Sequence, residues 1–490
     1  MKQNRRDFLR KTGCALSMVT LATQVEHFGL MSVLAQKVNS DTGAGGDYKA
    51  LVCIFLAGGN DGNNLVIPNH NSATISNYSA YAAARNTQGL AIPQAELLPI
   101  TVPRMGNLSY GLHPGLGPLG DGGNNGIHEL WAKGKLAIVT NCGTLVTPTT
   151  KTQYQQRSVP LPYQLFSHSD QVDQYQSGVA GTASFTGWGG RISDTMTGNS
   201  NPTALIPMVT SINGAQLFTA GQITLPLAIA NATTGLNQVL NPQGFNNTAE
   251  SQARLSAFNQ LRTQDLGASY VEAASNITDQ AMQANAALST FQEVTVNFPE
   301  TNIGQQLKQV ARLIKKRTDL TINRQIFYCQ LGGFDTHNNQ VVGQANLLSQ
   351  LSQAMRAFYD EMVVLGEQNN VTTFTMTDFG RTFNPAGSGA TVGTDHAWGN
   401  HLFVIGGSVL GGDFYGINSS NGTPYPTLVF NGPDDADSGT NARGRWIPTT
   451  SVDQYAATLA RWFGLAENNM TAVFPNIGNF GNTNLGFLTA

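Results

Sequence analysis

Charged residues are scarce in this chain, since Lys, Arg, Asp and Glu together make up 12% of its 490 residues. That is about half the usual share for a globular protein. The formal net charge at pH 7 is −3, so there is no surplus of basic residues to neutralise nucleic-acid phosphates or to bind an anionic membrane. We therefore expect no nucleic-acid partner. Hydrophobic residues still account for 41% of the chain, which argues against disorder and allows a large buried core.

Cysteine is also rare. Cys14 lies near the amino terminus, and Cys53, Cys142 and Cys329 each lie in an apolar, strand-like run. An odd number of cysteines in such runs makes a poor disulfide framework. None has the spacing of a zinc finger or of a haem-attachment motif. We expect these three cysteines to be buried, unreactive thiols.

The amino terminus has the pattern of an export signal. It begins MKQNRRDFLRK, continues with a mostly uncharged stretch over residues 12–23, and places Val33 and Ala35 where a signal peptidase requires small residues. A charged start, an apolar run and a small-residue cleavage site define a signal peptide, and the arginine pair before Phe-Leu indicates the twin-arginine type. The alternative is a basic, disordered segment. We predict a signal peptide over 1–35, with the twin-arginine translocase as partner and a periplasmic or secreted protein as product.

The rest of the chain predicts an α/β fold. Buried strands are indicated by short apolar runs bounded by Gly, Asn or Asp at 51–56, 135–140, 325–331, 371–377 and 401–407. Apolar residues recur at helical spacing over 345–366 and 303–316. Alternating strands and helices predict a central, mainly parallel sheet with helices on both faces. No apolar run is suited to a permanent membrane span.

Composition divides this α/β domain, which we place over 48–465. The stretch over about 180–300 is rich in Gln, Asn, Thr and Ala and poor in charge. It is predicted to be a polar insertion or cap. A long loop is expected at 410–448, and 466–490 is predicted to be a C-terminal tail.

Aspartate and histidine residues gather where the predicted strands end. Asp61 follows the strand at 51–56, whereas Asp335 and His337 follow the strand at 325–331, and Asp378 follows the strand at 371–377. Ligands of an open α/β sheet collect at the carboxyl ends of its strands. Carboxylate and imidazole side chains are also the usual ligands of hydrolytic metal ions.

Two more such residues, Asp395 and His396, precede the strand at 401–407. The six residues together predict one site for a divalent metal: zinc, manganese, magnesium or calcium. Each also has a simpler interpretation. Asp61 is compatible with a tight turn, Asp335 and His337 with a helix cap, and Asp378 with a local ion pair to Arg381. Asp395 and His396 are compatible with an ordinary polar loop.

Several motifs together resemble one family. They are LVCIFLAGGNDGNNLVIP, GLHPGLGPL, GWGGRISD, GGFDTHNNQ, TMTDFGRTF and GTDHAWGNHLFVIGG, found between about residues 48 and 465 behind the signal peptide. The set resembles the domain-of-unknown-function 1501 family of exported bacterial proteins, which is grouped with the alkaline phosphatase and sulfatase superfamily. The resemblance implies an alkaline-phosphatase-like fold with metals at the carboxyl edge of the sheet.

The resemblance also implies roles for single residues. Asp61 would be the first-strand metal aspartate, Asp335 and His337 paired ligands, and Asp378 the aspartate that bridges to a second metal. His396 would be the late histidine ligand, with Asp395 as a ligand or its partner. Two departures concern this set: Phe379 follows Asp378 where the superfamily commonly has His, and the spacing of Asp335 and His337 is shorter than usual.

The nucleophile is expected in the stretch QLFSHSDQVDQY. Superfamily members place theirs at a helix amino terminus, where backbone N–H groups bind anions. Ser167 fits that position, although Phe166 stands where related sequences tend to carry a basic residue, and a plain helix cap remains the alternative. His168 would be a general acid or a hydrogen-bonding residue, and Arg381 would bind an anionic ester or form a structural ion pair.

These expectations lead to two functional hypotheses. The first is an exported, metal-dependent hydrolase whose substrate is an anionic phosphate or sulfate ester. The second is a binding or assembly protein on the same scaffold that has lost catalysis. One fold supports many functions, so the arrangement of the site has to distinguish them.

Overall fold

The computed structural model describes residues 47–119, 123–239, 247–264, 266, 269–290 and 292–489. The predicted signal peptide over 1–35 lies outside these described residues. Cys53, Cys142 and Cys329 are buried and form no disulfide, as predicted.

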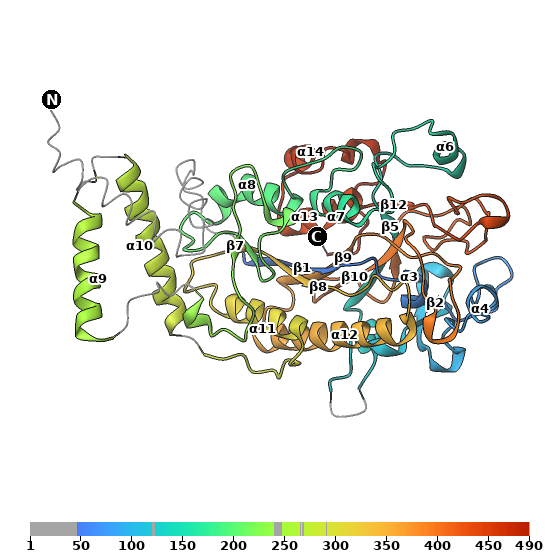
Figure 1. Cartoon of the computed structure of the whole chain (residues 1–490), viewed down its shortest axis with the longest axis horizontal. Helices are drawn as coiled ribbons and strands as arrows, with labels where there is room; N and C mark the ends of the chain where they lie inside the picture. Colours follow the sequence, from blue (N-terminus) through green and yellow to red (C-terminus); the bar gives the residue numbers. More distant parts are fainter. Residues whose placement is uncertain are drawn as a thin grey trace.

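A nine-stranded sheet forms the centre of the described chain (Figure 1). Its strands lie in the order β11-β5-β10-β9-β1-β8-β6-β7, and β12 pairs with β5. The five predicted apolar runs coincide with β1, β5, β8, β9 and β10, which confirms those strands. The strand bounds are β1 Lys49–Leu56, β5 Leu136–Gly143, β6 Val209–Ser211, β7 Leu227–Ala228, β8 Arg324–Leu331, β9 Val371–Thr377, β10 Asn400–Gly406, β11 Phe414–Tyr415 and β12 Thr450–Ser451.

The sheet is mixed, which corrects the prediction of a mainly parallel one. β1 runs parallel to both β8 and β9, but β10 runs antiparallel to both β9 and β5. Parallel neighbours need a crossover connection that is usually helical, and the connection from Thr377 to Asn400 contains no α-helix. Because β10 is reversed, the residues before it lie at the same edge of the sheet as the loops after β1, β8 and β9.

Helices cover both faces of the sheet (Figure 1). Alternate residues of β1 belong to two different apolar clusters: Val52 and Ile54 pack on one side with residues of α11 and α12, and Leu51 and Phe55 pack on the other with residues of α8 and α13. The predicted helices at 303–316 and 345–366 are confirmed as α11 and α12, although α12 begins five residues earlier. The helix bounds are α7 His168–Ser177, α8 Trp188–Ser200, α11 Asn302–Lys315, α12 Gln340–Val364, α13 Val452–Phe463 and α14 Met470–Val473.

A small antiparallel sheet lies beside the central one and connects β1 to β5 along the chain. Its strands are β2 Val66–Pro68, β4 Leu108–Leu112 and β3 Leu98–Val102. Short helices accompany it: α3 Gly62–Leu65, α4 Tyr78–Arg85 and α5 His128–Ala132. After β5, the helix α6 Lys151–Gln156 leads toward α7. Two of the family motifs reach into this region, GLHPGLGPL and the end of LVCIFLAGGNDGNNLVIP, but its strands were not predicted.

The polar stretch over 180–300 contains two kinds of structure. β6 and β7 extend the central sheet through the pairing of β6 with β8. In contrast, α9 Ala249–Arg262 and α10 Ser269–Ser289 lie beyond the β7 end of the sheet (Figure 1). The C-terminal residues pack onto the body of the protein, since Phe487 is buried and Leu488 bridges to Val409.

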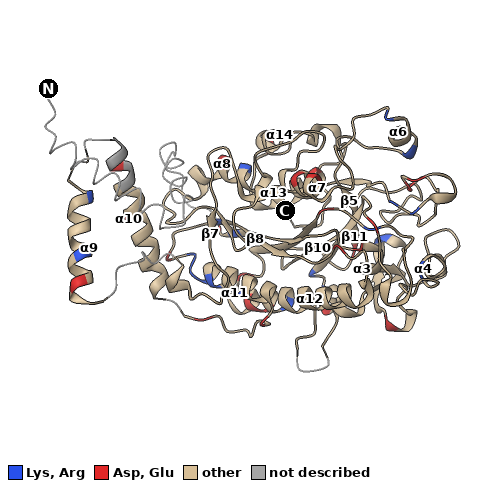
Figure 2. Ribbon diagram, in the orientation of Figure 1, with Lys and Arg blue, Asp and Glu red and all other residues tan. Residues whose placement is uncertain are grey.

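Charged residues are few along the described ribbon, and the two signs are interspersed (Figure 2). The longest helix of the described chain, α12, has 25 residues and includes Arg356, Asp360 and Glu361. None of the described helices combines the length and apolar character needed to cross a membrane.

Candidate functional site

The loops that follow β1, β8 and β9 come into close contact at one edge of the sheet, and two glycines make this possible. Gly58 has a φ of +114°, and a Cβ atom on it would lie 2.4 Å from the backbone nitrogen of Asp335. Gly59 has a φ of +75°, and its Cβ would lie 2.5 Å from the ring of Phe379. Because only glycine adopts such conformations without strain, the AGGNDG motif lets the three loops meet.

Three of the predicted residues form a compact set of possible metal ligands at this edge. One ligand atom each from His168, Asp335 and His396 lies within 4.8 Å of the others. Nε2 of His168 and Nε2 of His396 are both 3.3 Å from Oδ1 of Asp335. His337 lies beside them, with its Nε2 3.1 Å from the same oxygen and 3.0 Å from Nε2 of His396. We call these four residues the histidine cluster.

The partners of the two outer imidazoles determine which nitrogen faces the cluster. Nδ1 of His396 lies 2.7 Å from the carbonyl oxygen of Phe166, and a carbonyl only accepts, so Nδ1 donates. Nδ1 of His168 lies 2.7 Å from Oδ2 of Asp378, whose buried carboxylate also accepts the N–H of Gly58. In the neutral imidazoles Nε2 therefore carries the lone pair, and in both residues it points at Asp335. Nε2 of His168 is buried and has no hydrogen-bond partner, although Asp335 is near.

The electrostatics of the cluster keep opposite charges together. Burial tends to raise the pKa of Asp335, but its hydrogen bond and ion pair with Arg381, together with the nearby imidazoles of His168 and His337, lower it to about 2. The hydrogen bond to Asp378 raises the pKa of His168. Burial lowers the pKa of His396. Asp335 is thus an anion, and the neutral form of His396 is favoured.

Ser167 lies next to the cluster, as the N-cap residue of α7. Its side chain makes no capping hydrogen bond to the helix. Instead, Oγ donates to Oδ2 of Asp170 at 2.5 Å. The hydroxyl is therefore held by a carboxylate and not by the backbone, which differs from the plain helix cap that was the alternative interpretation.

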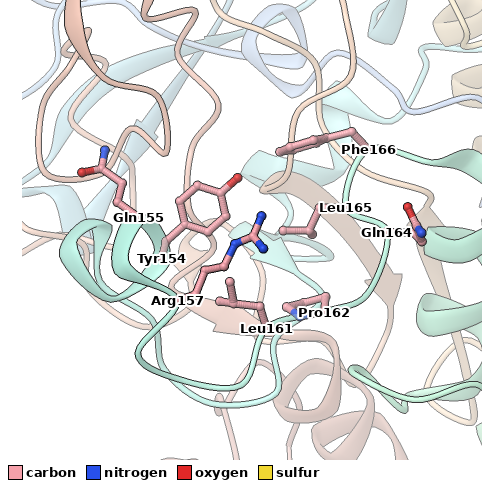
Figure 3. A pocket seen from close by; sticks show the side chains of 8 residues that line it. All are labelled: Tyr154, Gln155, Arg157, Leu161, Pro162, Gln164, Leu165 and Phe166. Atoms are coloured by element: carbon pink, nitrogen blue, oxygen red, sulfur yellow. The ribbon is translucent and has the colours of Figure 1, made fainter.

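A pocket of about 640 Å³ lies beside the cluster, and Phe166 is part of its wall (Figure 3). The carbonyl of Phe166 holds His396, and the guanidinium of Arg445 lies 5.3 Å from the centre of its ring. Arg445 also donates to the backbone oxygen of His396 at 2.9 Å. Phe166 therefore lines the pocket with its side chain and contacts the cluster through its carbonyl oxygen.

Arg381 is buried and its guanidinium is fully engaged. It donates to the carbonyl oxygens of Gly58, Gly59 and Thr394, and it forms an ion pair with Asp335. The local pair with Asp378 that the sequence allowed does not form, because Asp378 contacts His168 and Gly58. Arg381 thus holds the β1 loop and the cluster carboxylate in position.

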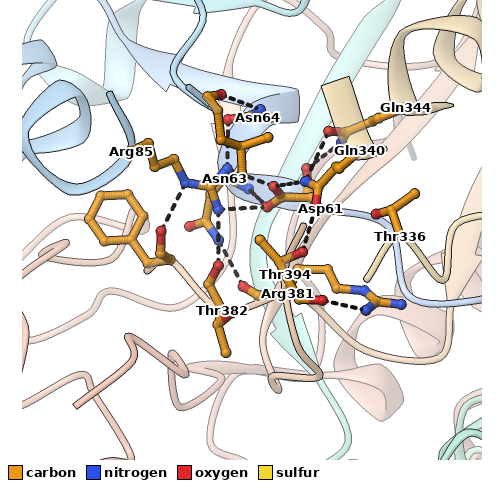
Figure 4. Close-up of polar contacts among 12 residues, drawn as sticks. Asp61, Asn63, Asn64, Arg85, Thr336, Gln340, Gln344, Arg381, Thr382 and Thr394 are labelled. Carbon is orange, nitrogen blue, oxygen red and sulfur yellow. Dashed lines mark hydrogen bonds and ion pairs between the residues drawn. The ribbon is translucent and has the colours of Figure 1, made fainter. Parts of the chain in front are cut away.

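Asp61 is not brought into the cluster. Its side chain is 0% exposed and forms an ion pair with Arg85, whose nitrogens lie 2.6 and 3.1 Å from the two carboxylate oxygens (Figure 4). The backbone N–H of Asn63 donates to it at 3.1 Å and the amide of Gln340 at 2.5 Å. Figure 4 shows these partners arranged around the carboxylate. Both of its oxygens therefore already accept hydrogen bonds from protein groups.

Asp395 lies at the rim of the cluster. Its Oδ1 is 3.3 Å from Nδ1 of His337, and its Oδ2 accepts from Arg443 at 2.5 Å. Burial raises the pKa of Asp395, but Arg443 and His337 outweigh this and lower it. Sequence reasoning missed both Arg443 and Arg85, because neither residue belongs to a motif that indicates its distant partner.

Some solved structures resemble the chain at low sequence identity. The PsFucS1 sulfatase from Pseudoalteromonas sp. is 7% identical, with a TM-score of 0.27 and coverage of 81% of this chain and 68% of that chain. The C-terminal periplasmic domain of EcEptC from Escherichia coli, in complex with Zn, is 10% identical, with a TM-score of 0.28 and coverage of 75% of each chain. The phosphonate monoester hydrolase of Agrobacterium radiobacter is 10% identical, with a TM-score of 0.29 and coverage of 85% and 74%.

The α/β class of this chain follows from its own sheet and helix layers rather than from these low scores. No curated protein sequence matches the chain. The model of the family described as "protein of unknown function (DUF1501)" matches residues 48–427, which include all residues of the histidine cluster. The chain therefore belongs to the DUF1501 family, as its motifs indicated.

Proposed function

We propose that this chain is a metal-dependent hydrolase of phosphate or sulfate esters, with the metal held by His168, Asp335 and His396. One observation carries the proposal. Nε2 of His168 and Nε2 of His396 point at the anionic Oδ1 of Asp335, each at 3.3 Å. Neutral His396 presents the lone pair of Nε2 to this oxygen, whereas the raised pKa of His168 favours a proton on its Nε2. A divalent cation would take the place of that proton and be coordinated by the three side chains.

The chemistry of the donor set selects among the four metals expected from the sequence. Imidazole ligands suit zinc and manganese, whereas calcium and magnesium prefer oxygen ligands. His337 is placed to add a third imidazole, with Asp395 as the partner of its other nitrogen. We therefore favour zinc or manganese. When bound, such an ion polarises the ester and stabilises the charge of the transferred group.

The surrounding residues position the ligands and the nucleophile. Asp378 and the carbonyl of Phe166 hold the rings of His168 and His396, which keeps each Nε2 directed inward. We assign Ser167 as the nucleophile and Asp170 as the base that accepts its hydroxyl proton. Oγ of Ser167 would form a bond to phosphorus or sulfur as the bond to the alcohol oxygen breaks, and the alcohol would leave with the proton that Asp170 accepted. Water would then hydrolyse the serine ester and release phosphate or sulfate.

We also propose that the protein is exported by the twin-arginine translocase to the periplasm or the medium. This part rests on the sequence of residues 1–35 alone. Export of a folded chain suits a protein whose metal is inserted in the cytoplasm. Replacement of Arg5 and Arg6 by lysines should leave the uncleaved protein in the cytoplasm, as detected by cell fractionation.

The test of the hydrolase begins with the metal content of the mature protein, purified without chelators and measured by mass spectrometry. We expect tightly bound zinc or manganese, followed by turnover of simple aryl phosphates or aryl sulfates. Turnover should disappear in Ser167→Ala while the metal stays bound. A folded protein that takes up none of the offered metals would exclude the proposal.

The binding or assembly protein remains the second candidate, and Asp61 is the observation that favours it. The superfamily role of this residue is metal binding, yet here it is tied to Arg85, and Phe379 stands where a further ligand is common. If the metal is present but no phosphate or sulfate ester is turned over, a partner captured by the wild type and lost on Asp335→Asn would support this candidate.

A further inference from the structure

The pocket lined by Phe166, whose carbonyl oxygen contacts the histidine cluster, has the properties of a ligand site. Its volume of about 640 Å³ lies within the usual range for small-molecule pockets. Because the carbonyl of Phe166 holds the His396 ring at 2.7 Å, a group in this pocket would be next to an ester bound at the cluster. The alcohol part of such an ester, which is the leaving group of its hydrolysis, would therefore lie in this pocket.

The lining combines an apolar surface with one cationic group. Leu161, Pro162 and Leu165 supply aliphatic surface, and Tyr154 and Phe166 supply aromatic rings. Figure 3 shows the guanidinium of Arg157 between Tyr154 and the two leucines. No Asp or Glu is among the lining residues of this described region.

Arg157 is available to a ligand. Within the described part of the chain, its side chain forms neither a hydrogen bond nor an ion pair, whereas the nearby Arg445 is paired with Asp437 at 2.9 and 3.0 Å. An arginine in a pocket without a carboxylate favours an anionic partner, since its planar fork matches acidic oxygens.

The backbone of the pocket is also unusual. Arg157, Gln164 and Phe166 have φ values of +50°, +46° and +73°, although none of them is glycine. Left-handed backbone costs free energy in such residues, and it is found mainly where the surroundings impose it, often at ligand sites. Arg157 is the C-cap residue of α6, where this conformation is common, so Gln164 and Phe166 are the two residues that indicate a pocket shape maintained against local preference.

We propose that this pocket binds the leaving group of the substrate, and that this group is a sugar ring with a second acidic substituent. A sugar ring has an apolar face suited to Tyr154 and the leucines, and hydroxyl groups suited to the polar rim formed by residues such as Gln155. The second acidic group pairs with Arg157. The inference extends the proposed hydrolase by naming the class of its substrate as a multiply anionic sugar ester.

Binding of glucose 6-sulfate, glucose and inorganic sulfate, measured by isothermal titration calorimetry in proteins that all also carry Ser167→Ala, tests the proposal without turnover. We expect glucose 6-sulfate to bind most tightly, with similar affinity in the wild type and in Asp335→Asn. Arg157→Gln should weaken it at least about tenfold, as expected for loss of a charge-assisted contact. Arg157→Lys should retain part of the affinity. Arg104→Gln serves as the control, because Arg104 is exposed and paired with Asp413 elsewhere.

Unchanged affinity in Arg157→Gln would overturn the proposal, as would binding that is lost in Asp335→Asn but insensitive to Arg157. Equal or tighter binding of 4-nitrophenyl sulfate would also overturn it, since the pocket would then select an aryl group. If the wild type binds glucose 6-sulfate through Arg157 but turns over no ester, the pocket assignment stands and the hydrolase proposal fails.

Discussion

Nδ1 of His168 lies 2.7 Å from Oδ2 of Asp378, although the two residues are 210 positions apart in the chain. Asp378 is buried, and the N–H of Gly58 lies 3.1 and 3.2 Å from its two oxygens. The carboxylate is therefore held in one place, and it turns Nε2 of His168 toward Asp335. In this arrangement Asp378 orients the histidine that we propose as a metal ligand, a role different from the metal bridge that the family resemblance implied.

Replacement of Asp378 by Asn should weaken metal binding by about 10- to 100-fold, the usual effect of losing a partner that orients a metal-binding histidine. The amide can donate to Nδ1 and so reverse the tautomer of His168. Competition with a chelator would measure the change in metal affinity. Asp360→Asn is the control, since Asp360 pairs with Arg356 on α12. An unaltered affinity in Asp378→Asn would contradict this role.

Asp335 and Asp61 should respond in opposite ways to replacement by Asn. Asp335 is 47% exposed, and buried Arg381 keeps three backbone carbonyl partners without it, so Asp335→Asn should abolish metal binding with little loss of stability. Asp61→Asn should leave the metal in place but lower the free energy of unfolding by about 3–5 kcal/mol, because Arg85 loses its buried ionic partner. Metal analysis and urea denaturation of both variants distinguish these effects. Loss of metal from folded Asp61→Asn would restore Asp61 as a ligand.

Gly58→Ala should disrupt the site through the backbone. A Cβ atom there would lie 2.4 Å from the nitrogen of Asp335, and the φ of +114° is unfavourable for alanine. We expect stability to fall by at least roughly 1–3 kcal/mol, the usual cost of such strain, and metal affinity to fall with it. Gly106→Ala is a useful comparison, because it has a positive φ but nothing within 4 Å of its Cβ position. Equal effects on metal binding in the two variants would show that contact with Asp335 is unimportant.

Asp453 should make stability depend on pH. It is buried in the first turn of α13, and desolvation raises its pKa to about 7. In the unfolded chain an Asp titrates near 3.9, so between about pH 4 and 7 the folded state retains a proton that the unfolded state releases. The free energy of unfolding should therefore fall as the pH rises through this window, by up to roughly 4 kcal/mol at 1.36 kcal/mol per pKa unit.

Asp453→Asn should remove most of this decrease, since the amide does not ionise. Urea denaturation of the wild type and the variant at several pH values between 4 and 8 would test this. The free energy of unfolding of the variant should exceed that of the wild type by an amount that grows with pH. Parallel pH profiles in the two proteins would mean that Asp453 does not titrate in this window.

Sequence patterns identified the long strands and the helices α11 and α12, because those patterns act through local burial. The apolar run at 51–56 is buried on both faces of the sheet, and the helical spacing over 345–366 describes the buried face of α12. The direction of β10 was beyond such reasoning. Strand direction depends on how the connecting segment folds. The apolar run at 401–407 predicts a buried strand but not whether that strand runs parallel or antiparallel to its neighbours.

The sequence by itself determined the chemistry available to this protein: glycine-rich turns after buried strands, and Asp and His residues beside them. The tertiary structure alone decided which of these residues meet. His168 lies in the cluster because α7 packs at the edge of the sheet. Asp61 instead forms an ion pair with Arg85, a residue of α4. The physical reason is that burial patterns repeat locally along the chain, while ligand geometry and ion pairing depend on contacts between residues hundreds of positions apart.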